Sequence, residues 1–506
     1  MKSRSSGILI HPLSFINKYG CGDLGEGAYK IIDFLKASGQ KILQILPIGP
    51  TGFSNSPYQS FSSFAGNPYF ISFDKLMEKR FLKKSDLDDY PVINKSVIDY
   101  ELLYLNKYNV LDKAFLNFKK SKKFTEYDAF CKKNSFWLKD FSLFMAIKES
   151  QNGASWITWD YEIKDRKDLN NIIKRLRDRI EFYNFIQWQF FEQWNDFINY
   201  AHNNNIKIIG DMPIFVSYDS VEVWIDRELF YLDEHGNPIY IAGVPPDYFS
   251  ETGQLWGNPV YRWDIMEKRG FEWWKNRIKY ILNYVDCIRI DHFRGFEAYW
   301  QIPYGEKTAI NGKWEKVPGY DFFNTLKKEF GDQLSELIIA EDLGIITDEV
   351  KKMRDDFNIS GMRVFEFANF ENIKIDKKTK KHYSNEPYLP ENYVKNCIAY
   401  PGTHDNDTIK GWFKSLEKSK KKIILDYLGI KDAEGLSNAI IKKIANSKAN
   451  TVIFLMQDVL GLGSESRMNL PGSCSIHNWS WCVTEELLTD DIAKNLYKIT
   501  KNAGRI

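Results

Sequence analysis

One short segment, Arg289 to Gly295, combines a cation with a carboxylate at the end of an apolar run. Side chains two residues apart on a strand point to the same face, so Arg289 and Asp291 are expected to lie side by side. A guanidinium favours the ionised form of a neighbouring carboxyl group, and an ionised carboxylate at a strand end can act as a nucleophile. An ordinary Arg–Asp ion pair explains the same residues, and the segment taken alone favours that simpler interpretation.

Three further segments repeat the pattern of an apolar strand that ends in an acidic residue. They cover residues 207–211, 337–341 and 398–405, and they end in Asp211, Glu341 and the pair His404-Asp405. In a (β/α)8 barrel the catalytic residues come from the C-terminal ends of several strands, which lie together at one face. Four acid-bearing strand ends therefore predict an active site on a barrel of this kind.

Eight apolar segments separated by helix-like stretches supply the strands that such a barrel requires. They cover residues 7–11, 42–47, 207–212, 285–290, 337–340, 362–365, 397–400 and 451–455. Strands that alternate with helices predict a parallel sheet, and eight such units predict closure. We therefore expect the α/β class, as a (β/α)8 TIM barrel with inserted, largely helical subdomains.

We expect residues 1–506 to form a single catalytic barrel. Two of the connections between its strands are too long to be simple loops. Residues from about 50 to 170 have charged, helix-compatible sequence and are expected to form inserted helical subdomains. Residues from about 215 to 269 form a second insertion, whose loop at 243–249 presents two aromatic residues and contains two shape-fixing prolines. The helix expected at 181–200 carries an aromatic stripe that we assign to core packing.

The bulk composition excludes several functional classes. A net charge of +2 provides no large field of one sign, which argues against nucleic-acid binding and favours a neutral or small substrate. The six cysteines form no Cys-x-x-Cys pair, which is typical of reduced thiols in a cytoplasmic protein without a metal site. No signal peptide, membrane-spanning run or phosphate-binding glycine loop is found. The 15% of aromatic residues fits a sugar site, although core packing must account for most of them.

Ten motifs, in order along the chain, resemble those of the amylomaltase (disproportionating enzyme) family of 4-α-glucanotransferases, which are relatives of the α-amylases. The resemblance runs from Gly7 to about Trp481. The motifs occupy residues 6–12, 56–60, 64–69, 210–216, 243–250, 253–259, 289–295, 340–344, 402–408 and 467–472.

The resemblance implies a retaining double displacement with three catalytic carboxyl groups. Asp291 is implied as the nucleophile that forms a glucosyl ester, Glu341 as the general acid/base, and Asp405 as the carboxylate that binds the donor sugar. Retention requires that Glu341 carries a proton at neutral pH, which the negative charges of Asp291 and Asp405 would favour. This chemistry needs neither a cofactor nor a metal.

The resemblance also implies the substrate and the residues that bind it. The partners are α-1,4-linked glucans, namely maltodextrin, maltose and glucose as acceptor, with no nucleic acid and no membrane, and the protein is expected to be a monomer or a homodimer. Tyr248 and Phe249 correspond to an aromatic loop over the acceptor side. The implied substrate-binding residues are Tyr58, Asp211, Tyr248, Phe249, Trp256, Arg289, His404 and Asn469.

Several nearby residues compete for these roles. Asp342 could replace Glu341 as acid/base, but neighbouring strand residues face opposite ways, and the family pattern favours Glu341. We interpret His11 and His292 as hydrogen-bonded structural residues, Asp407 as a loop or helix-cap residue, and Trp479 and Trp481 as core residues.

Two other functions remain open at this point. A hydrolase that acts on α-1,4-glucans would use the same glycosyl-enzyme and differ only in the attack of water. A binding protein without catalysis is less consistent with the presence of all three carboxylates. The loop at 245–249, which could exclude water and bind an acceptor sugar, favours transfer.

Overall fold

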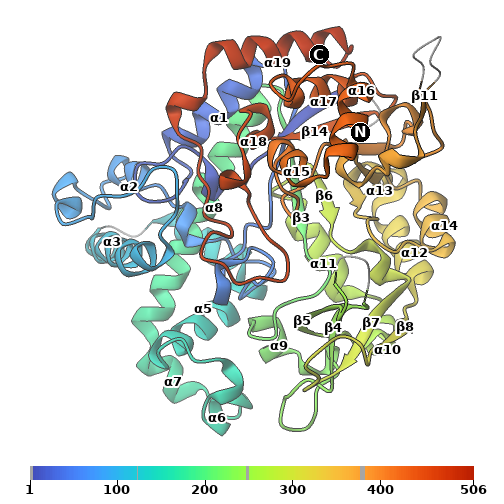
Figure 1. The fold of residues 1–506 in the computed structure, drawn as a ribbon. Helices are drawn as coiled ribbons and strands as arrows, with labels where there is room; N and C mark the ends of the chain where they lie inside the picture. The colour runs from blue at the N-terminus through green and yellow to red at the C-terminus, as the bar shows by residue number, and fades with distance from the viewer. Residues whose placement is uncertain (1–3, 122–123, 247–249, 376–381) are drawn as a thin grey trace.

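The computed structural model describes residues 4–121, 124–246, 250–375 and 382–506. Its centre is an eight-stranded parallel sheet with the strand order β10-β13-β14-β1-β2-β3-β6-β9 (Figure 1). The strands are β1 (Ser5–Leu9), β2 (Ile42–Gln44), β3 (Lys207–Met212), β6 (Cys287–Ile290), β9 (Ile338–Ala340), β10 (Gly361–Val364), β13 (Cys397–Tyr400) and β14 (Thr451–Leu455).

The two outer strands of this order meet, so the sheet closes on itself. Ile339 of β9 forms a parallel bridge with Ser360, the residue before β10. The backbone N–H of Ala340 donates to the carbonyl oxygen of Ser360 over 2.9 Å. The predicted (β/α)8 barrel is therefore confirmed.

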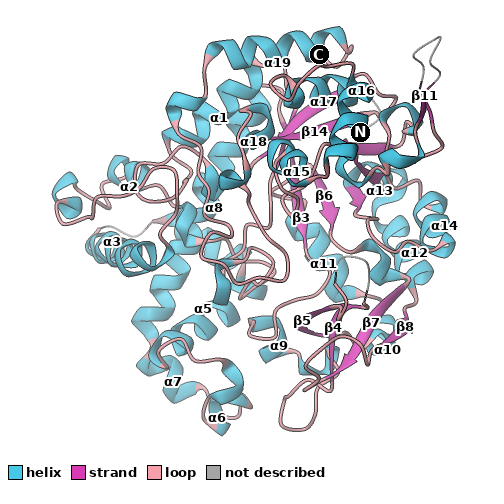
Figure 2. Ribbon diagram, viewed as in Figure 1, coloured by secondary structure: helices cyan, strands magenta, loops and turns pink. Residues whose placement is uncertain are grey.

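Helices cover the outside of the barrel between successive strands (Figure 2). The main covering helices are α1 (Glu26–Ala37), α8 (Arg177–Asn203), α11 (Glu272–Ile281), α12 (Gly319–Phe330), α14 (Asp348–Asp356), α17 (Leu436–Ala445) and α19 (Asp490–Asn502). Shorter ones are α13 (Leu334–Leu337), α15 (Ile409–Ser415), α16 (Lys418–Leu428) and α18 (Met456–Val459). Within the described residues, no helix has both the length and the apolar character needed to cross a bilayer.

Alternate strand residues build two separate cores. Ile209 and Ile339 belong to a cluster that fills the inside of the barrel, whereas Ile208 and Ile288 pack outward with the helices. This two-sided burial is expected for parallel strands covered by helices. The aromatic stripe of α8, from Phe182 to Phe197, is buried against the outer cluster, which confirms its assignment to core packing.

The connection between β2 and α8 is helical. It contains α2 (Phe73–Glu78), α3 (Tyr100–Lys120), α4 (Thr125–Lys133), α5 (Ser135–Ser150), α6 (Tyr161–Lys164) and α7 (Asn170–Arg175). Several of these helices lie to one side of the barrel in Figure 1.

A four-stranded antiparallel sheet, which the sequence reading did not anticipate, lies beyond the C-terminal ends of the barrel strands (Figure 1). Its order is β5-β4-β7-β8, and two of its strands come from each of two barrel connections. The strands are β4 (Tyr240–Val244), β5 (Gln254–Pro259), β7 (Ala298–Pro303) and β8 (Lys313–Lys316), accompanied by α9 (Val221–Ile225) and α10 (Trp263–Lys268). A separate two-stranded hairpin pairs β11 (Lys374–Ile375) with β12 (His382–Tyr383).

Three of the eight predicted strands have the predicted bounds, and two others differ notably. The strand predicted at 7–11 is β1, which begins two residues earlier because the backbones of Ser5 and Ser6 already pair with β14. The strand predicted at 42–47 ends as β2 at Gln44, although the N–H of Ile45 still donates to Ile209 of β3 over 2.9 Å.

Candidate active site

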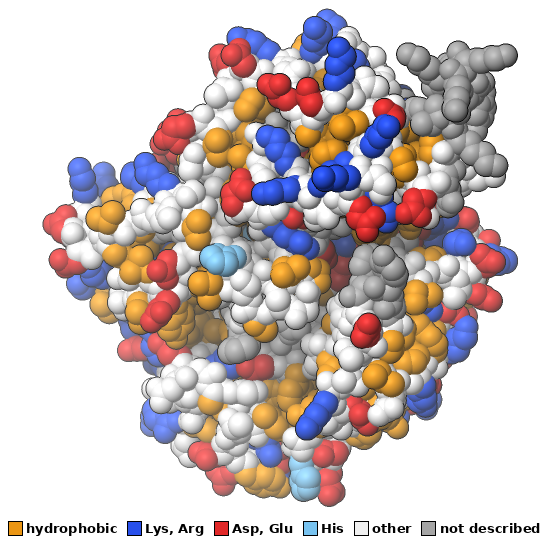
Figure 3. All heavy atoms as spheres, in the orientation of Figure 1, with side chains coloured by type: hydrophobic (Ala, Val, Ile, Leu, Met, Phe, Trp, Pro, Cys, Tyr) orange, Lys and Arg blue, Asp and Glu red, His pale blue; other side chains and the backbone are white. Residues whose placement is uncertain are grey.

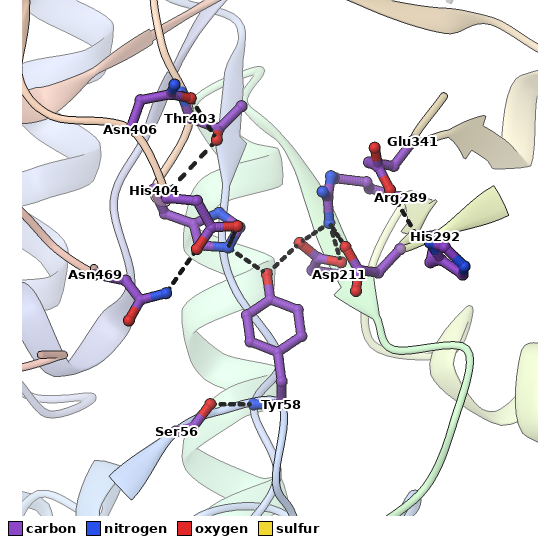
Figure 4. A network of polar contacts seen from close by, with 12 residues as sticks. Ser56, Tyr58, Asp211, Arg289, His292, Glu341, Thr403, His404, Asn406 and Asn469 are labelled. Atoms are coloured by element: carbon purple, nitrogen blue, oxygen red, sulfur yellow. Dashed lines mark hydrogen bonds and ion pairs between the residues drawn. The ribbon is translucent and has the colours of Figure 1, made fainter. Parts of the chain in front are cut away.

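The candidate catalytic side chains meet at the C-terminal end of the barrel. Asp211 lies within β3, and Asp291 and Glu341 follow directly after β6 and β9. His404 and Asp405 lie in the loop after β13. Figure 4 shows Glu341 and His292 on one side of Arg289, and His404 and Asn469 on the other side. The four strand ends that the sequence singled out are therefore brought together.

Arg289 holds two carboxylates at the floor of the site. Asp211 and Arg289 are direct partners in the β3–β6 register, and Arg289 Nη1 lies 2.8 and 2.7 Å from the two oxygens of Asp211. The same nitrogen lies 3.0 Å from Asp291 Oδ1, as the spacing of two residues predicts. The Asp211 side chain is fully buried, whereas 31% of the Asp291 side chain is exposed. Asp291 is therefore the carboxylate of this pair that faces outward.

Tyr58 connects this floor to His404. Its hydroxyl donates to Asp211 Oδ2 over 2.9 Å and lies 2.9 Å from His404 Nε2. Because the hydroxyl has one hydrogen, which goes to Asp211, its oxygen must accept from His404, which places a proton on Nε2. The two rings also stack, with centroids 5.3 Å apart and an interplanar angle of 14°.

Asp405 is held from the opposite side by Asn469. The amide nitrogen of Asn469 donates to Asp405 Oδ1 over 2.7 Å, and His404 Nε2 lies 3.4 Å from Asp405 Oδ2. Arg467 fixes both partners, because it donates to the backbone oxygens of Asp405 and Asn469, each over 2.7 Å. Nearly half of the Asp405 side chain, 45%, remains exposed and is available to a ligand.

Glu341 is oriented by two backbone donors. The N–H of His292 donates to Glu341 Oε2 over 2.7 Å, and the N–H of Leu343 donates to Oε1 over 2.8 Å. His292 adopts a left-handed conformation with φ of 53°, which is uncommon for a residue other than glycine. This conformation directly follows Asp291 in the chain and aims the His292 N–H at the neighbouring carboxyl group.

Burial and the nearby charge of Asp291 raise the pKa of Glu341 to about 8, against the opposing effects of Arg289 and the two backbone N–H groups. Burial is the larger cause, and the charge of Asp291 adds to it, as expected from the sequence. A carboxyl group with this pKa carries its proton at neutral pH and can donate it.

Burial also raises the pKa of Asp291, to about 6, even though Arg289 lowers it. The charges of Asp211 and Asp405 act in the same direction as burial. The order of the two pKa values decides the chemistry: between them, Asp291 is ionised while Glu341 is protonated. One carboxylate can then attack an electrophilic carbon while the other carboxylic acid protonates a departing oxygen.

Trp256 of β5 reaches the site from the antiparallel sheet. Its ring meets that of His292 edge to face, with centroids 4.8 Å apart. Tyr248 and Phe249, the other aromatic residues predicted to bind substrate, lie outside the described residues.

The competing acidic residues are engaged elsewhere. Asp342 forms an ion pair with Arg354 and accepts from the N–H of Met362 over 2.6 Å, and its side chain is only 3% exposed. Asp407 lies just before α15. It accepts from the N–H of Thr408 and from the hydroxyl of Ser464. These contacts confirm that Asp342 points away from Glu341 and that Asp407 is a loop residue.

The interpretation of the histidines was wrong in part. Neither ring nitrogen of His11 has a hydrogen-bond partner within the described residues, and the same holds for His292 Nε2. Burial lowers the pKa of each imidazole to about 3, so both rings are neutral. Trp479 and Trp481 are buried, as expected for core residues, although Trp479 also packs against the rings of Tyr58 and His404.

Sequence reasoning missed two supporting groups. Arg467 belongs to a recognised motif, and its position two residues before Asn469 was the available signal, but no role was given to it. The backbone N–H of His292 gives no signal in the sequence, because it depends on the conformation after β6 and on the placement of β9.

Comparisons with known proteins show what the whole chain is similar to. The family model described as 4-alpha-glucanotransferase matches residues 10–487. A 4-alpha-glucanotransferase of Synechocystis is 45% identical over 512 aligned positions, which cover 100% of this chain and 99% of the relative. Another, of Clostridium butyricum, is 45% identical over 501 positions and covers 98% of this chain and 100% of the relative.

Solved structures agree with this result. The amylomaltase of Streptococcus agalactiae in complex with acarbose superimposes with a TM-score of 0.94 at 38% identity, and the match covers 99% of both chains. The amylomaltase of Corynebacterium glutamicum shares the fold, with a TM-score of 0.78 at 17% identity over 99% of this chain and 75% of its own.

Proposed function

This chain belongs to the 4-alpha-glucanotransferase family, and from that membership we propose how its site works. It transfers α-1,4-glucan segments from a maltodextrin donor to the 4-hydroxyl of glucose or of another maltodextrin. The observation that carries this proposal is the pairing of an outward-facing Asp291, beside Arg289, with a Glu341 whose pKa is raised above neutrality.

In the first step, an Asp291 oxygen attacks the anomeric carbon of the donor sugar. The bond from that carbon to the glycosidic oxygen breaks, and Glu341 gives its proton to the departing oxygen. The donor segment is then held as an ester on Asp291, and Glu341 is left as a carboxylate. Its two backbone donors, the N–H groups of His292 and Leu343, stabilise this charged form.

In the second step, the acceptor enters where the leaving group was. Glu341 takes the proton of the acceptor 4-hydroxyl, whose oxygen attacks the anomeric carbon and breaks the ester to Asp291. Two inversions at the same carbon restore the α configuration. The active site returns to its starting protonation state.

Donor recognition is proposed for the residues on the other side of Arg289. Asp405, His404 and Asn469 form a connected polar group, and the exposed part of Asp405 is available to sugar hydroxyls. Asp211 has no exposed side-chain surface. We therefore propose that Asp211 acts through its partners Arg289 and Tyr58 and does not itself contact the sugar.

Incubation with maltotriose alone tests the reaction. Transfer converts it into glucose and longer oligosaccharides, which are resolved by chain length. Glucose and maltose as sole products would instead show a hydrolase that acts on the same linkage. An unchanged substrate would support a binding protein without catalysis.

The roles of the two carboxyl groups are tested with Glu341→Gln and a glucosyl donor that has a good leaving group. Such a donor needs little protonation, so Asp291 is still glycosylated, whereas the second step stalls without a base. Mass spectrometry should find a trapped hexosyl group on the peptide that carries Asp291. Glu341→Gln combined with Asp291→Asn is the control and should carry none, and an adduct on another carboxylate would overturn both assignments.

A further inference from the structure

A row of apolar side chains crosses the antiparallel sheet beside the site. Leu255 of β5, Gly243 of β4, Trp300 of β7 and Trp314 of β8 are direct partners in the strand registers. Residues directly opposite one another in antiparallel strands point to the same face. Leu255 is 38% exposed and Trp314 is 37% exposed, so the two ends of this row are open to solvent. We name Leu255, Trp300 and Trp314 the outer row.

The two indole rings of the outer row are held in place. They meet edge to face with centroids 5.2 Å apart, and Trp300 Nε1 donates to the carbonyl oxygen of Ala309 over 2.8 Å. The guanidinium of Arg294 lies 3.6 Å from the centroid of the Trp314 ring and hydrogen-bonds the carbonyl oxygen of Ile345. An exposed ring that is fixed in this way loses little conformational freedom on binding, which favours recognition.

The Trp314 end of the outer row adjoins the segment that follows Glu341. Arg294, which covers Trp314, lies three residues after Asp291, and its partner Ile345 lies four residues after Glu341. The group that binds the donor lies on the opposite side of Arg289 (Figure 4). Since the acid/base contacts the oxygen of the leaving group and of the acceptor, the Trp314 end of the outer row adjoins the acceptor side.

The chemistry of this surface fits a glucan chain. Each glucose unit offers apolar C–H groups to an aromatic face and hydroxyls to polar neighbours. Lys313 and Lys316 flank Trp314 on β8 and are exposed, so polar donors border the apolar row. Hydrophobic side chains also gather over this sheet in Figure 3.

We propose that the outer row binds the distal part of a long α-1,4-glucan acceptor, several sugar units away from Asp291. This proposal rests on the proposed function and adds a determinant of acceptor length to it. Short acceptors such as glucose are held near Glu341 and do not reach the row, whereas long acceptors gain contact with Trp314.

The test compares acceptors of different length in Trp314→Ala and Trp314→Phe, with one labelled donor. In Trp314→Ala, the KM for a long maltodextrin acceptor should rise about five-fold, because a ring contact contributes on the order of 1 kcal/mol. The KM for glucose and the kcat for both acceptors should stay at the wild-type value. Trp314→Phe keeps a flat ring and should recover most of the lost affinity.

Tyr161→Ala is the matched control, because Tyr161 is 60% exposed on the distant helix α6 and belongs to no part of the site. Equal KM values for wild type and Trp314→Ala with long acceptors would overturn the proposal, as would an equal change for glucose. A change of oligomeric state in Trp314→Ala without a length effect would show that a second copy of the chain covers the row. If the wild-type protein does not redistribute maltotriose, the proposed function is wrong. This outcome is distinct from the absence of an effect of acceptor length, which concerns the outer row alone.

Discussion

Asp291 and Glu341 follow neighbouring barrel strands, yet their carboxyl groups have different surroundings. Asp291 lies against Arg289, which opposes the effect of burial on its pKa. Glu341 is oriented by two backbone N–H groups and has no ion-pair partner within the described residues. Burial is the largest influence on both pKa values, and it raises that of Glu341 further. This difference allows one group to act as a nucleophile and the other as an acid.

Asp291→Asn should reduce transfer by several orders of magnitude while the fold is retained. An amide has nearly the same shape as a carboxylate but is a poor nucleophile. The measurement is kcat/KM on maltotriose together with thermal unfolding. Activity close to wild type in a folded variant would contradict the assignment.

The pH profile of kcat/KM should be bell-shaped. Activity should rise as Asp291 ionises through its pKa of about 6 and fall as Glu341 loses its proton through its pKa of about 8. Glu341→Gln, assayed for the glycosylation step with a good leaving group, should lose the alkaline limb only. An alkaline limb that persists in this variant would assign it to another group.

At the level of elements, the loop after β13 is fixed by a hydrogen bond to a residue that follows the neighbouring strand, β14. Asp458, in α18 directly after β14, accepts from the N–H of Ile409 over 2.7 Å, at the start of α15. Its side chain is buried, and the loop that it anchors carries His404 and Asp405. The position of the donor-binding group therefore depends on a residue that does not contact it.

Asp458→Ala should lower kcat/KM on maltotriose at least ten-fold, because small displacements of binding groups have large effects on rate. Asp458→Asn is the matched variant, since its amide oxygen can still accept from Ile409, and it should keep most of the activity. If both variants lose activity equally, the hydrogen bond is not the reason. Thermal unfolding of both variants shows whether a loss of activity comes from a displaced loop or from an unfolded protein.

At the level of the whole molecule, a buried arginine joins the two ends of the chain at the barrel end opposite the active site. Arg505 has no exposed surface, and its guanidinium donates only to backbone oxygens. These belong to Ser5, Ala445, Ser447, Ala449 and Asn450. Five carbonyl groups around the first residues of β1 and β14 are therefore satisfied by one side chain.

Arg505→Ala should lower the free energy of unfolding by about 3 kcal/mol or more, because it removes five hydrogen bonds made by one buried, charged donor. The kinetic constants below the unfolding temperature should not change. Arg4→Ala is the control, since Arg4 bonds the same region but is exposed, and it should lower the unfolding temperature less. If both variants lowered the unfolding temperature equally, the burial of Arg505 would not be the reason for its effect on stability.

Local patterns of residues were sufficient to predict the barrel and the set of candidate carboxylates. Apolar strand segments identify themselves through local composition, and a strand delivers its C-terminal acid to the common face whatever the rest of the chain does. The i, i+2 spacing of Arg289 and Asp291 predicted their contact for the same local reason. The β5-β4-β7-β8 sheet was not predictable in this way, because its strands pair across two separate connections.

The differences between these groups depend on how the chain packs in the folded molecule. The buried state of Asp211, the raised pKa of Glu341 and the support of Asp405 by Asn469 and Arg467 all depend on contacts between residues that are far apart in the chain. Desolvation is a property of the packed environment and has no local signature in the sequence. The sequence therefore identified which residues could react, and the packing around them decided which one keeps its proton.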